Sequence, residues 1–342
     1  MYVYLAYQLT KSRYHLIAII LMCNLFITNT QSQQLSYTKA ENQQSYQFNY
    51  QWLDHKNIKQ HLDFSLTKEG LFERFRDFKS YHSNYAQKTI LRRVKQQMQQ
   101  SINPAIQLSY QQHNQLVLQV RGQDEKKVAS AYNKLITLEK EVTEKYLQET
   151  YYQEFTNHQQ VSGIKVDHVS IANDSVDDLK PLKPIILALD SLKNIREVTN
   201  FVLGFVQSIP YSKLESRLTS SGAGFNPPLK LLWENQGDCD SKMTLTAALL
   251  RALMPRIKMV FIYIEGHAFI GINIKANPDE VSISYDNISY LLAEPTGPAL
   301  LPLGVLSQES ELAIRQGHYS VQKFHEVLSI DNKNKLQLEQ PM

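Results

Sequence analysis

One short stretch, residues 237–253, limits what this chain can fold into more than any other. It reads GDCDSKMTLTAALLRAL, so a glycine, an acidic residue and a cysteine precede a run composed largely of alanine, leucine and methionine. A helix that is apolar nearly all round belongs at the centre of a domain. We therefore expect a buried helix that holds Cys239 in its first turn.

The residues around Cys239 indicate a reactive thiol. Asp238 is a good N-cap candidate, because its carboxylate can accept hydrogen bonds from the free N–H groups of the first turn. Those N–H groups and the helix dipole favour a thiolate, so the sequence predicts a lowered pKa for the Cys239 thiol. A nucleophile is one interpretation of this cysteine, and a buried structural thiol is the other.

Two later segments favour the nucleophile. GHAFIGI (266–272) is typical of a strand that opens with His267, and YLLAEPT (290–296) of a strand that closes with Glu294. A thiol, a base that removes its proton and a group that orients the base form the minimal apparatus for covalent acyl transfer. Asp286, which precedes the second strand, is the alternative orienting carboxylate.

In this order of elements, the chain resembles the transglutaminase-like superfamily of papain-fold thiol enzymes. The resemblance is carried by the three segments above and by FVQSIPY (205–211), and it covers about residues 195–300. It implies an α+β fold in which a central helix packs on an antiparallel sheet. It also implies a triad of Cys239, His267 and Glu294. Relatives generally carry Asp in the third position, although Pro295 and Thr296 follow here as they do in the family.

The resemblance further implies an oxyanion site, which needs at least two donors. The backbone N–H of Cys239 is one donor. The second usually comes from a side chain upstream of the cysteine, and we predict Gln207 in this role. Tyr211, Trp233 and Gln236 are the alternatives.

This chemistry implies no metal and no organic cofactor. A zinc site built from His267, His318 and His325 is a weak alternative. The last two histidines are seven residues apart, and no clear ligand set accompanies them.

The first 32 residues resemble a secretory signal. They contain no acid, and Lys11 and Arg13 precede an apolar run over 16–27. An uncleaved membrane anchor is one alternative. A lipoprotein signal at Cys23 is another, which the bulky Met22 disfavours. We expect a periplasmic or secreted protein with no stable membrane span after cleavage.

The rest of the 342-residue chain has room for two ordinary domains. An α+β module is predicted over 33–172, a linker over 173–184 and the transglutaminase-like domain over 185–342. Hairpins are expected over 46–66 and 106–120, helices over 86–100, 125–155 and 185–207, a loop over 212–235, and strands over 162–172, 257–264, 267–274, 281–285 and 290–293.

The function predicted from these features is a thiol hydrolase that cleaves amide bonds in a peptide or protein through an acyl-enzyme. A protein-glutamine transferase is an alternative, and so is a binding or assembly protein with a degenerate site. The formal net charge of +3 is too small to indicate a nucleic-acid partner. The expected partner is therefore a peptide or protein substrate.

Overall fold

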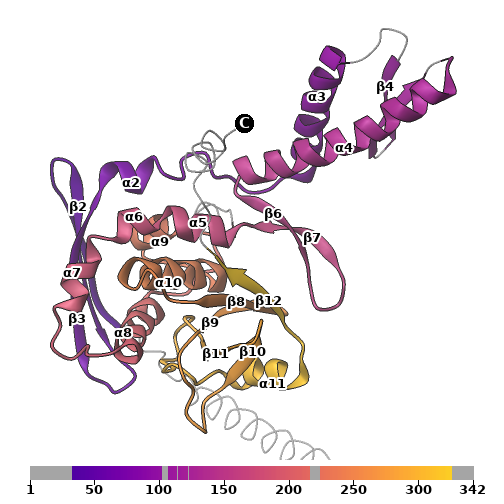
Figure 1. Ribbon diagram of the computed structural model, residues 1–342. Helices are drawn as coiled ribbons and strands as arrows, with labels where there is room; N and C mark the ends of the chain where they lie inside the picture. Colours follow the sequence, from indigo (N-terminus) through magenta and orange to yellow (C-terminus); the bar gives the residue numbers. More distant parts are fainter. Residues whose placement is uncertain (1–32, 102–106, 114, 122, 216–223, 326–342) are drawn as a thin grey trace, which may run out of the picture. The chain divides into compact units, whose positions relative to one another are not determined.

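The computed structural model describes residues 33–101, 107–113, 115–121, 123–215 and 224–325 (Figure 1). The predicted signal over 1–32 lies outside these residues. From Gln33 onward the chain forms one compact unit of helices and antiparallel sheets, which confirms the α+β class. No helix among the described residues is long and apolar enough to cross a membrane.

The first half of the chain contains both predicted hairpins and both predicted helices. Its elements are β1 (Gln34–Glu41), β2 (Ser45–Leu53), β3 (Lys59–Thr67), α2 (Lys68–Phe72), α3 (Ser83–Ser101), β4 (Gln107–His113), β5 (Gln115–Arg121), α4 (Glu125–Glu149), β6 (Tyr152–Thr156) and β7 (Ser162–Val166).

The second half contains the expected strands of the core, but the helix expected over 185–207 is divided into two, and the loop expected over 212–235 contains a helix. Its elements are α5 (His168–Asp174), α6 (Val176–Leu179), α7 (Leu182–Leu187), α8 (Ile195–Ser208), α9 (Pro228–Glu234), α10 (Cys239–Leu253), β8 (Met259–Ile264), β9 (His267–Ile272), β10 (Ser282–Tyr285), β11 (Ile288–Ala293), α11 (Gln308–Gln316) and β12 (Ser320–Phe324).

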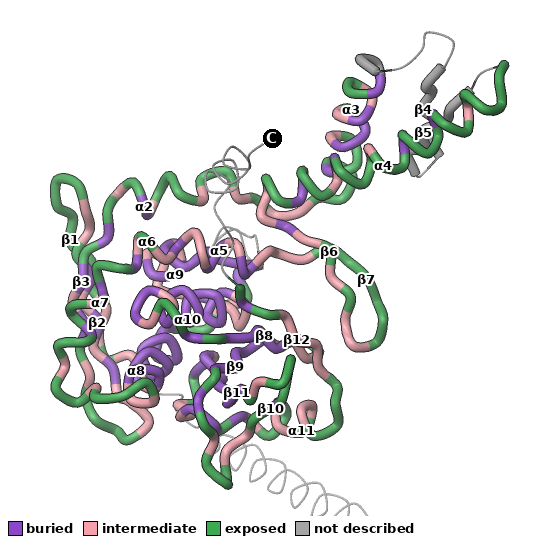
Figure 2. The backbone as a smooth tube through the Cα atoms, in the orientation of Figure 1, coloured by how far each residue is buried: buried purple, intermediate pink, exposed green. Residues whose placement is uncertain are grey.

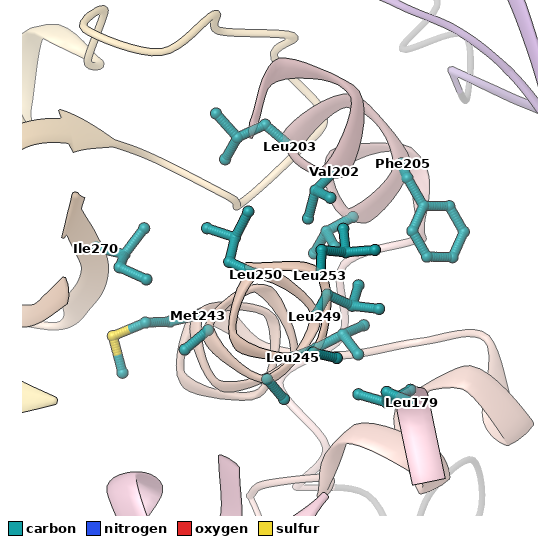
Figure 3. Packing of buried hydrophobic residues seen from close by; sticks show 14 of the residues in the cluster. Leu179, Val202, Leu203, Phe205, Met243, Leu245, Leu249, Leu250, Leu253 and Ile270 are labelled. Atoms are coloured by element: carbon teal, nitrogen blue, oxygen red, sulfur yellow. The ribbon is translucent and has the colours of Figure 1, made fainter. Parts of the chain in front are cut away.

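Helix α10 lies at the centre of the main core, as its composition predicts. Figure 3 shows its leucines directed toward α8, toward Leu179 of α6 and toward Ile270 of β9. Leu245, Leu249 and Leu250 are fully buried. Each such side chain contributes about 1.5–3 kcal/mol by leaving water. The first turn of α10 is therefore fixed by a rigid, buried rod.

The sheet that packs on α10 has the strand order β10-β11-β9-β8-β12, and all its neighbouring strands are antiparallel. Strands β8 and β9 are joined by only Glu265 and Gly266. Gly266 has φ +68°, a conformation that suits glycine in a tight turn. Strand β12 was not expected. The alternation of apolar and polar residues in β12 is weak, because Gln322 and Lys323 follow each other between the apolar residues.

The predicted boundary near residue 172 is wrong in terms of packing. The buried faces of β2 and β3, including Phe48, Tyr50 and Trp52, belong to the same core as α8 and α10. Figure 2 shows this continuous buried interior. The apolar face of a three-stranded sheet must be covered, and α8 covers it through Phe201 and Phe205.

The predicted linker over 173–184 is also wrong. It contains α6 and the start of α7, and both Leu179 and Leu182 are fully buried against the main core. Pro181 and Pro184 suggested a connection, but proline is compatible with the first turn of a helix. The strand predicted over 162–172 ends at Val166, and α5 follows it.

Helices α3 and α4 form a smaller core of their own. Val94 and Met98 of α3 pack with Leu135, Val142 and Tyr146 of α4. This cluster shares no buried residue with the core around α10. Helix α4 ends at Glu149, earlier than predicted, because the chain turns into β6 at Tyr152.

Candidate active site

The start of α10 has the predicted capping geometry. Asp238 Oδ1 accepts a hydrogen bond from the backbone N–H of Ser241 at 3.0 Å and another from the Ser241 hydroxyl. Ser241 Oγ also accepts from the N–H of Asn226 at 2.8 Å. Gly237 is needed next to this cap, because a Cβ there would come within 2.6 Å of Leu231. The approach to Cys239 is therefore closely packed.

His267 and Glu294 are brought together as predicted. In the register of β9 and β11, Ala293 lies opposite Ile270, so Glu294 falls on the same face as His267 and close to it. His267 Nε2 lies 2.7 Å from Glu294 Oε1. The alternative carboxylate, Asp286, lies at the other end of β11 and pairs with Lys323.

The Glu294 carboxylate is held by the start of α11. Its Oε2 accepts from the N–H of Ser307 at 2.8 Å, and its Oε1 accepts from the hydroxyls of Ser307 and Ser310. Burial would raise the pKa of Glu294, but the hydrogen bonds from His267 and Ser307 outweigh burial and lower it. Glu294 is therefore a fixed carboxylate that favours a proton on Nε2 of His267.

This arrangement leaves the other ring nitrogen of His267 available. No residue of the described chain hydrogen-bonds His267 Nδ1. Because Glu294 accepts at Nε2, the neutral ring carries its proton there and Nδ1 is the basic nitrogen. This is the protonation state that a general base requires.

The thiol of Cys239 lies beside the peptide that follows His267. Ala268 packs in the core next to α10, and the backbone N–H of Ala268 acts on the sulfur. Among the described residues, no hydrogen bond joins the Cys239 sulfur to the His267 ring. The hydrogen-bond contact found for the sulfur is to Asp240 Oδ1, at 3.9 Å. The sulfur thus lies beside the start of β9, at the peptide that follows His267.

The predicted lowering of the Cys239 pKa is wrong for this structure. Burial, which has the largest effect, and the carboxylates of Asp240 and Asp238 together raise the pKa of the thiol to about 12. The N–H groups of Ala268 and Asp240 act in the opposite direction but are outweighed. The helix dipole favours a thiolate, but the desolvation of a thiol at the end of a buried helix has the larger effect on the pKa.

Gln207 does not fit the predicted oxyanion role. Its amide nitrogen donates to the carbonyl oxygens of Glu294 and Leu301, both at 2.8 Å, which uses both amide hydrogens. Gln207 is also only 2% exposed. The structure gives it a different role, which is to hold the chain after β11 and so to place Glu294.

Among the alternatives, Gln236 lies three residues before Cys239, and its side-chain amide donates to Glu234 Oε2 at 3.5 Å. Tyr211 lies beside the segment that leads to the cysteine. Tyr211 forms a backbone bridge with Gly237, two residues before Cys239, and the residue is 48% exposed. Trp233 instead packs against Tyr46, Phe72 and Lys39 in the N-terminal sheet region. The Tyr211 hydroxyl has no hydrogen-bond partner in the described part of the chain.

A buried polar network behind Cys239 was not predicted. His168 Nε2 lies 3.8 Å from Asp240 Oδ2, and His168 Nδ1 lies 3.1 Å from the hydroxyl of Tyr263. That hydroxyl and Lys165 Nζ both donate to Gln322. Burial lowers the pKa of His168 to about 4 and that of Lys165 to about 7. Nothing in the local sequence indicates this network, because its members come from five different elements, β7, α5, α10, β8 and β12.

The histidines of the zinc alternative are not gathered into one ligand set. The ring of His318 stacks on His158, and His325 Nδ1 faces the carbonyl of Lys323. Within the described ranges, no group of three or more His, Cys, Asp or Glu side chains is arranged to hold a metal ion.

No family model matches this chain, and a search of curated proteins returns no match.

Proposed function

We propose that this protein is a thiol hydrolase of the transglutaminase-like type that cleaves amide bonds in a peptide or protein. Cys239 is the nucleophile, His267 the general base and acid, and Glu294 the group that orients the base. The observation that carries the proposal is the 2.7 Å contact between His267 Nε2 and Glu294 Oε1, in which the carboxylate is itself held by Ser307.

The first half of the reaction forms an acyl-enzyme. Because the resting thiol is protonated, His267 Nδ1 removes its proton as the sulfur attacks the carbonyl carbon. The carbonyl oxygen becomes an oxyanion. His267 then gives the proton to the amide nitrogen as the C–N bond breaks. The amine leaves, and the acyl group remains on Cys239 as a thioester.

The second half uses water. His267 removes a proton from a water molecule that attacks the thioester, and the tetrahedral intermediate collapses to a carboxylic acid. The sulfur leaves and takes the proton back from His267 as the thiol. Glu294 stabilises the imidazolium in both halves, since its pKa is held below the usual value.

Two donors serve the oxyanion in this proposal. One is the backbone N–H of Cys239, as the family resemblance implies. The other is the hydroxyl of Tyr211, which lies at the same edge as the cysteine. Burial raises the pKa of Tyr211, and charge on Cys239 raises it further, so the hydroxyl stays protonated and can donate at working pH.

One observation favours the non-catalytic alternative, a binding or assembly protein. The thiol pKa is raised and the Cys239–His267 bond is absent, so the unliganded site has no thiolate–imidazolium pair. The protein-glutamine transferase would use the same residues but deliver the acyl group to an amine. The proposed location is the periplasm or the outside of the cell, from the signal over 1–32, with an uncleaved N-terminal anchor as the alternative.

Peptide cleavage by the purified full chain tests the proposal. A denatured protein and a mixed peptide library would be incubated with the wild type and with Cys239→Ala, and new amino termini would be identified by mass spectrometry. Termini that form only with the wild type support the hydrolase. Incorporation of a labelled primary amine in excess of hydrolysis would favour the transferase. If neither product forms, the result favours the binding or assembly protein.

A further inference from the structure

A cavity lies in the part of the molecule formed by α3 and α4. It has a volume of about 490 Å³, within the range of small-ligand sites. The segment 77–82, the first half of α3, the end of α4 and the start of β6 line it. None of Cys239, His267 and Glu294 is among its lining residues, so it is distinct from the proposed active site.

The cavity carries uncompensated positive charge. Lys79, Arg92 and Arg93 line it, and Asp77 is its only acidic lining residue. Arg93 is already paired with Glu149 at 2.7 Å. In the described part of the chain, the side chains of Lys79 and Arg92 form no ion pair. Two cations are therefore free to meet an anion.

The N-terminus of α3 adds to the positive electrostatic potential of the cavity. The cavity is lined by Tyr81, His82 and Tyr85, which surround the first turn of the helix. That turn contains no acidic residue, so no side chain within it offsets the positive end of the helix dipole. The dipole of this helix start therefore adds to the positive charge of Lys79 and Arg92.

Tyrosine hydroxyls supply further donors. Among the described residues, the hydroxyls of Tyr81, Tyr85 and Tyr146 have no hydrogen-bond partner, whereas that of Tyr152 donates to the carbonyl of Lys79 at 2.7 Å. Burial raises the pKa of Tyr146, and the neighbouring Tyr81 and Tyr85 raise it further, so its hydroxyl stays protonated. The cavity thus presents more donors than one small anion can use.

Ring contacts connect the wall of this cavity to the proposed active site. Phe78, which lies between the lining residues Asp77 and Lys79, packs against Phe225 with ring centroids 5.7 Å apart. Phe225 in turn packs against His168 at 5.2 Å, and His168 lies 3.8 Å from Asp240, the residue after Cys239. The cavity wall is therefore anchored, through two side chains, on the residue next to the nucleophile.

We propose that this cavity is an exosite that binds an acidic segment of a peptide or protein. The carboxylates of the bound peptide meet Lys79, Arg92 and the start of α3, and the backbone carbonyls of the peptide accept hydrogen bonds from the tyrosine hydroxyls. The identification of that peptide as the substrate rests on the proposed function. The binding of an acidic peptide does not, so the two can be tested separately.

Fluorescence anisotropy tests the binding with full-length Cys239→Ala, which binds without cleavage. The probes are a labelled glutamate-rich peptide and a glutamine-rich peptide of the same length. We expect the acidic peptide to bind at least about tenfold more tightly, and Lys79→Gln/Arg92→Gln to weaken it by about tenfold. The matched control is Lys88→Gln/Lys134→Gln, which removes the same charge from exposed positions of α3 and α4 that do not line the cavity.

Three results would overturn the proposal. The first is equal binding of the two peptides, and the second is equal weakening by the cavity and control variants, which would show general attraction to positive charge. The third is displacement of the peptide by inorganic phosphate at a concentration comparable to its own, which would make the ligand a small anion. Tyr81→Phe/Tyr85→Phe keeps all charges and should weaken binding by about threefold, as expected for lost neutral hydrogen bonds.

The cleavage assay then separates the two proposals. If the acidic peptide binds the cavity but no variant cleaves any substrate, the exosite stands and the hydrolase fails. If the wild type cleaves glutamate-rich and glutamine-rich substrates with the same KM, the hydrolase stands and the exosite's link to the substrate fails.

Discussion

The two halves of the proposed site differ in how the protein treats charge. Around Glu294, backbone and hydroxyl donors from α11 and the ring of His267 lower the pKa of a buried carboxylate. Around Cys239, burial and two carboxylates raise the pKa of a buried thiol. Both groups lie at the ends of rigid elements, so burial alone does not explain the contrast. The contrast is explained by the number of hydrogen-bond donors that point at each group.

This difference indicates that the base is prepared in the resting protein and the nucleophile is not. In the proposed mechanism, thiolate forms only when a proton acceptor and a carbonyl carbon are both present, and this would protect the free thiol from oxidation and alkylation. A secreted protein with a single remaining cysteine would gain from such protection.

Removal of either reacting side chain should have the largest effect. We expect Cys239→Ala and His267→Ala each to lower kcat/KM for amide cleavage by about 10³-fold or more, because the two residues share one proton transfer. His61→Ala, an exposed histidine in β3, serves as the control and should leave the rate unchanged. Residual cleavage by Cys239→Ala above a tenth of the wild-type rate would place the nucleophile elsewhere.

Glu294→Gln should have the next largest effect. The amide keeps the shape of the side chain but removes the charge that stabilises the imidazolium, and we expect kcat to fall by about 10²–10³-fold. Asp286→Asn provides a matched comparison, since sequence alone offers both carboxylates for the role. Equal losses in the two variants would contradict the assignment of Glu294.

The pH dependence of Cys239 alkylation measures how far the thiol is ionised in the resting protein. With a thiol pKa raised to about 12, the thiolate fraction should rise about tenfold per pH unit between pH 7 and 10. Asp240→Asn removes a neighbouring negative charge, which lowers the thiol pKa, so iodoacetamide should label Cys239 several-fold faster at pH 8.

Asp190→Asn, an exposed carboxylate outside the site, should leave the labelling rate unchanged. A labelling rate that is already at its plateau at pH 6 would show a preformed thiolate. That result would remove the contrast between the two halves.

The smallest effect is expected at the helix that holds Glu294. Ser307→Ala removes the N-cap of α11 and one hydroxyl donor to the carboxylate, and should cost about 1 kcal/mol in the free energy of unfolding. It should also lower kcat several-fold. Thr67→Ala removes the N-cap of α2 and should cost similar stability without a change in kcat. Urea unfolding and steady-state kinetics of both variants separate the two roles.

Local signals in the sequence predicted the parts of the fold that depend on neighbouring residues. The apolar run after Cys239 and the cap at Asp238 predicted α10, and the turn at Glu265–Gly266 predicted the β8–β9 hairpin. The pairing of His267 with Glu294 could be predicted because both lie at ends of adjacent strands. The features that were missed depend on long-range packing.

Four residues show why the rest could not be predicted. Leu179 and Leu182 lie in a stretch of acids and prolines, and only their burial against the main core turns that stretch into helices. Gln207 was given an oxyanion role because the register that points its amide at the carbonyls of Glu294 and Leu301 is not visible in sequence. The raised pKa of Cys239 likewise depends on how deeply the end of α10 is covered.

The central claim is that Cys239 and His267 act together on an amide carbon, and trapping the acyl group tests it most directly. An intact peptide that the wild type is known to cleave would be mixed with the full chain, and the reaction would be quenched in acid within seconds. The protein mass would then be measured before and after treatment with hydroxylamine. We predict an added acyl mass on Cys239 that hydroxylamine removes, present in the wild type and absent in His267→Ala. An adduct of equal yield in both proteins, or none in either, would contradict the account.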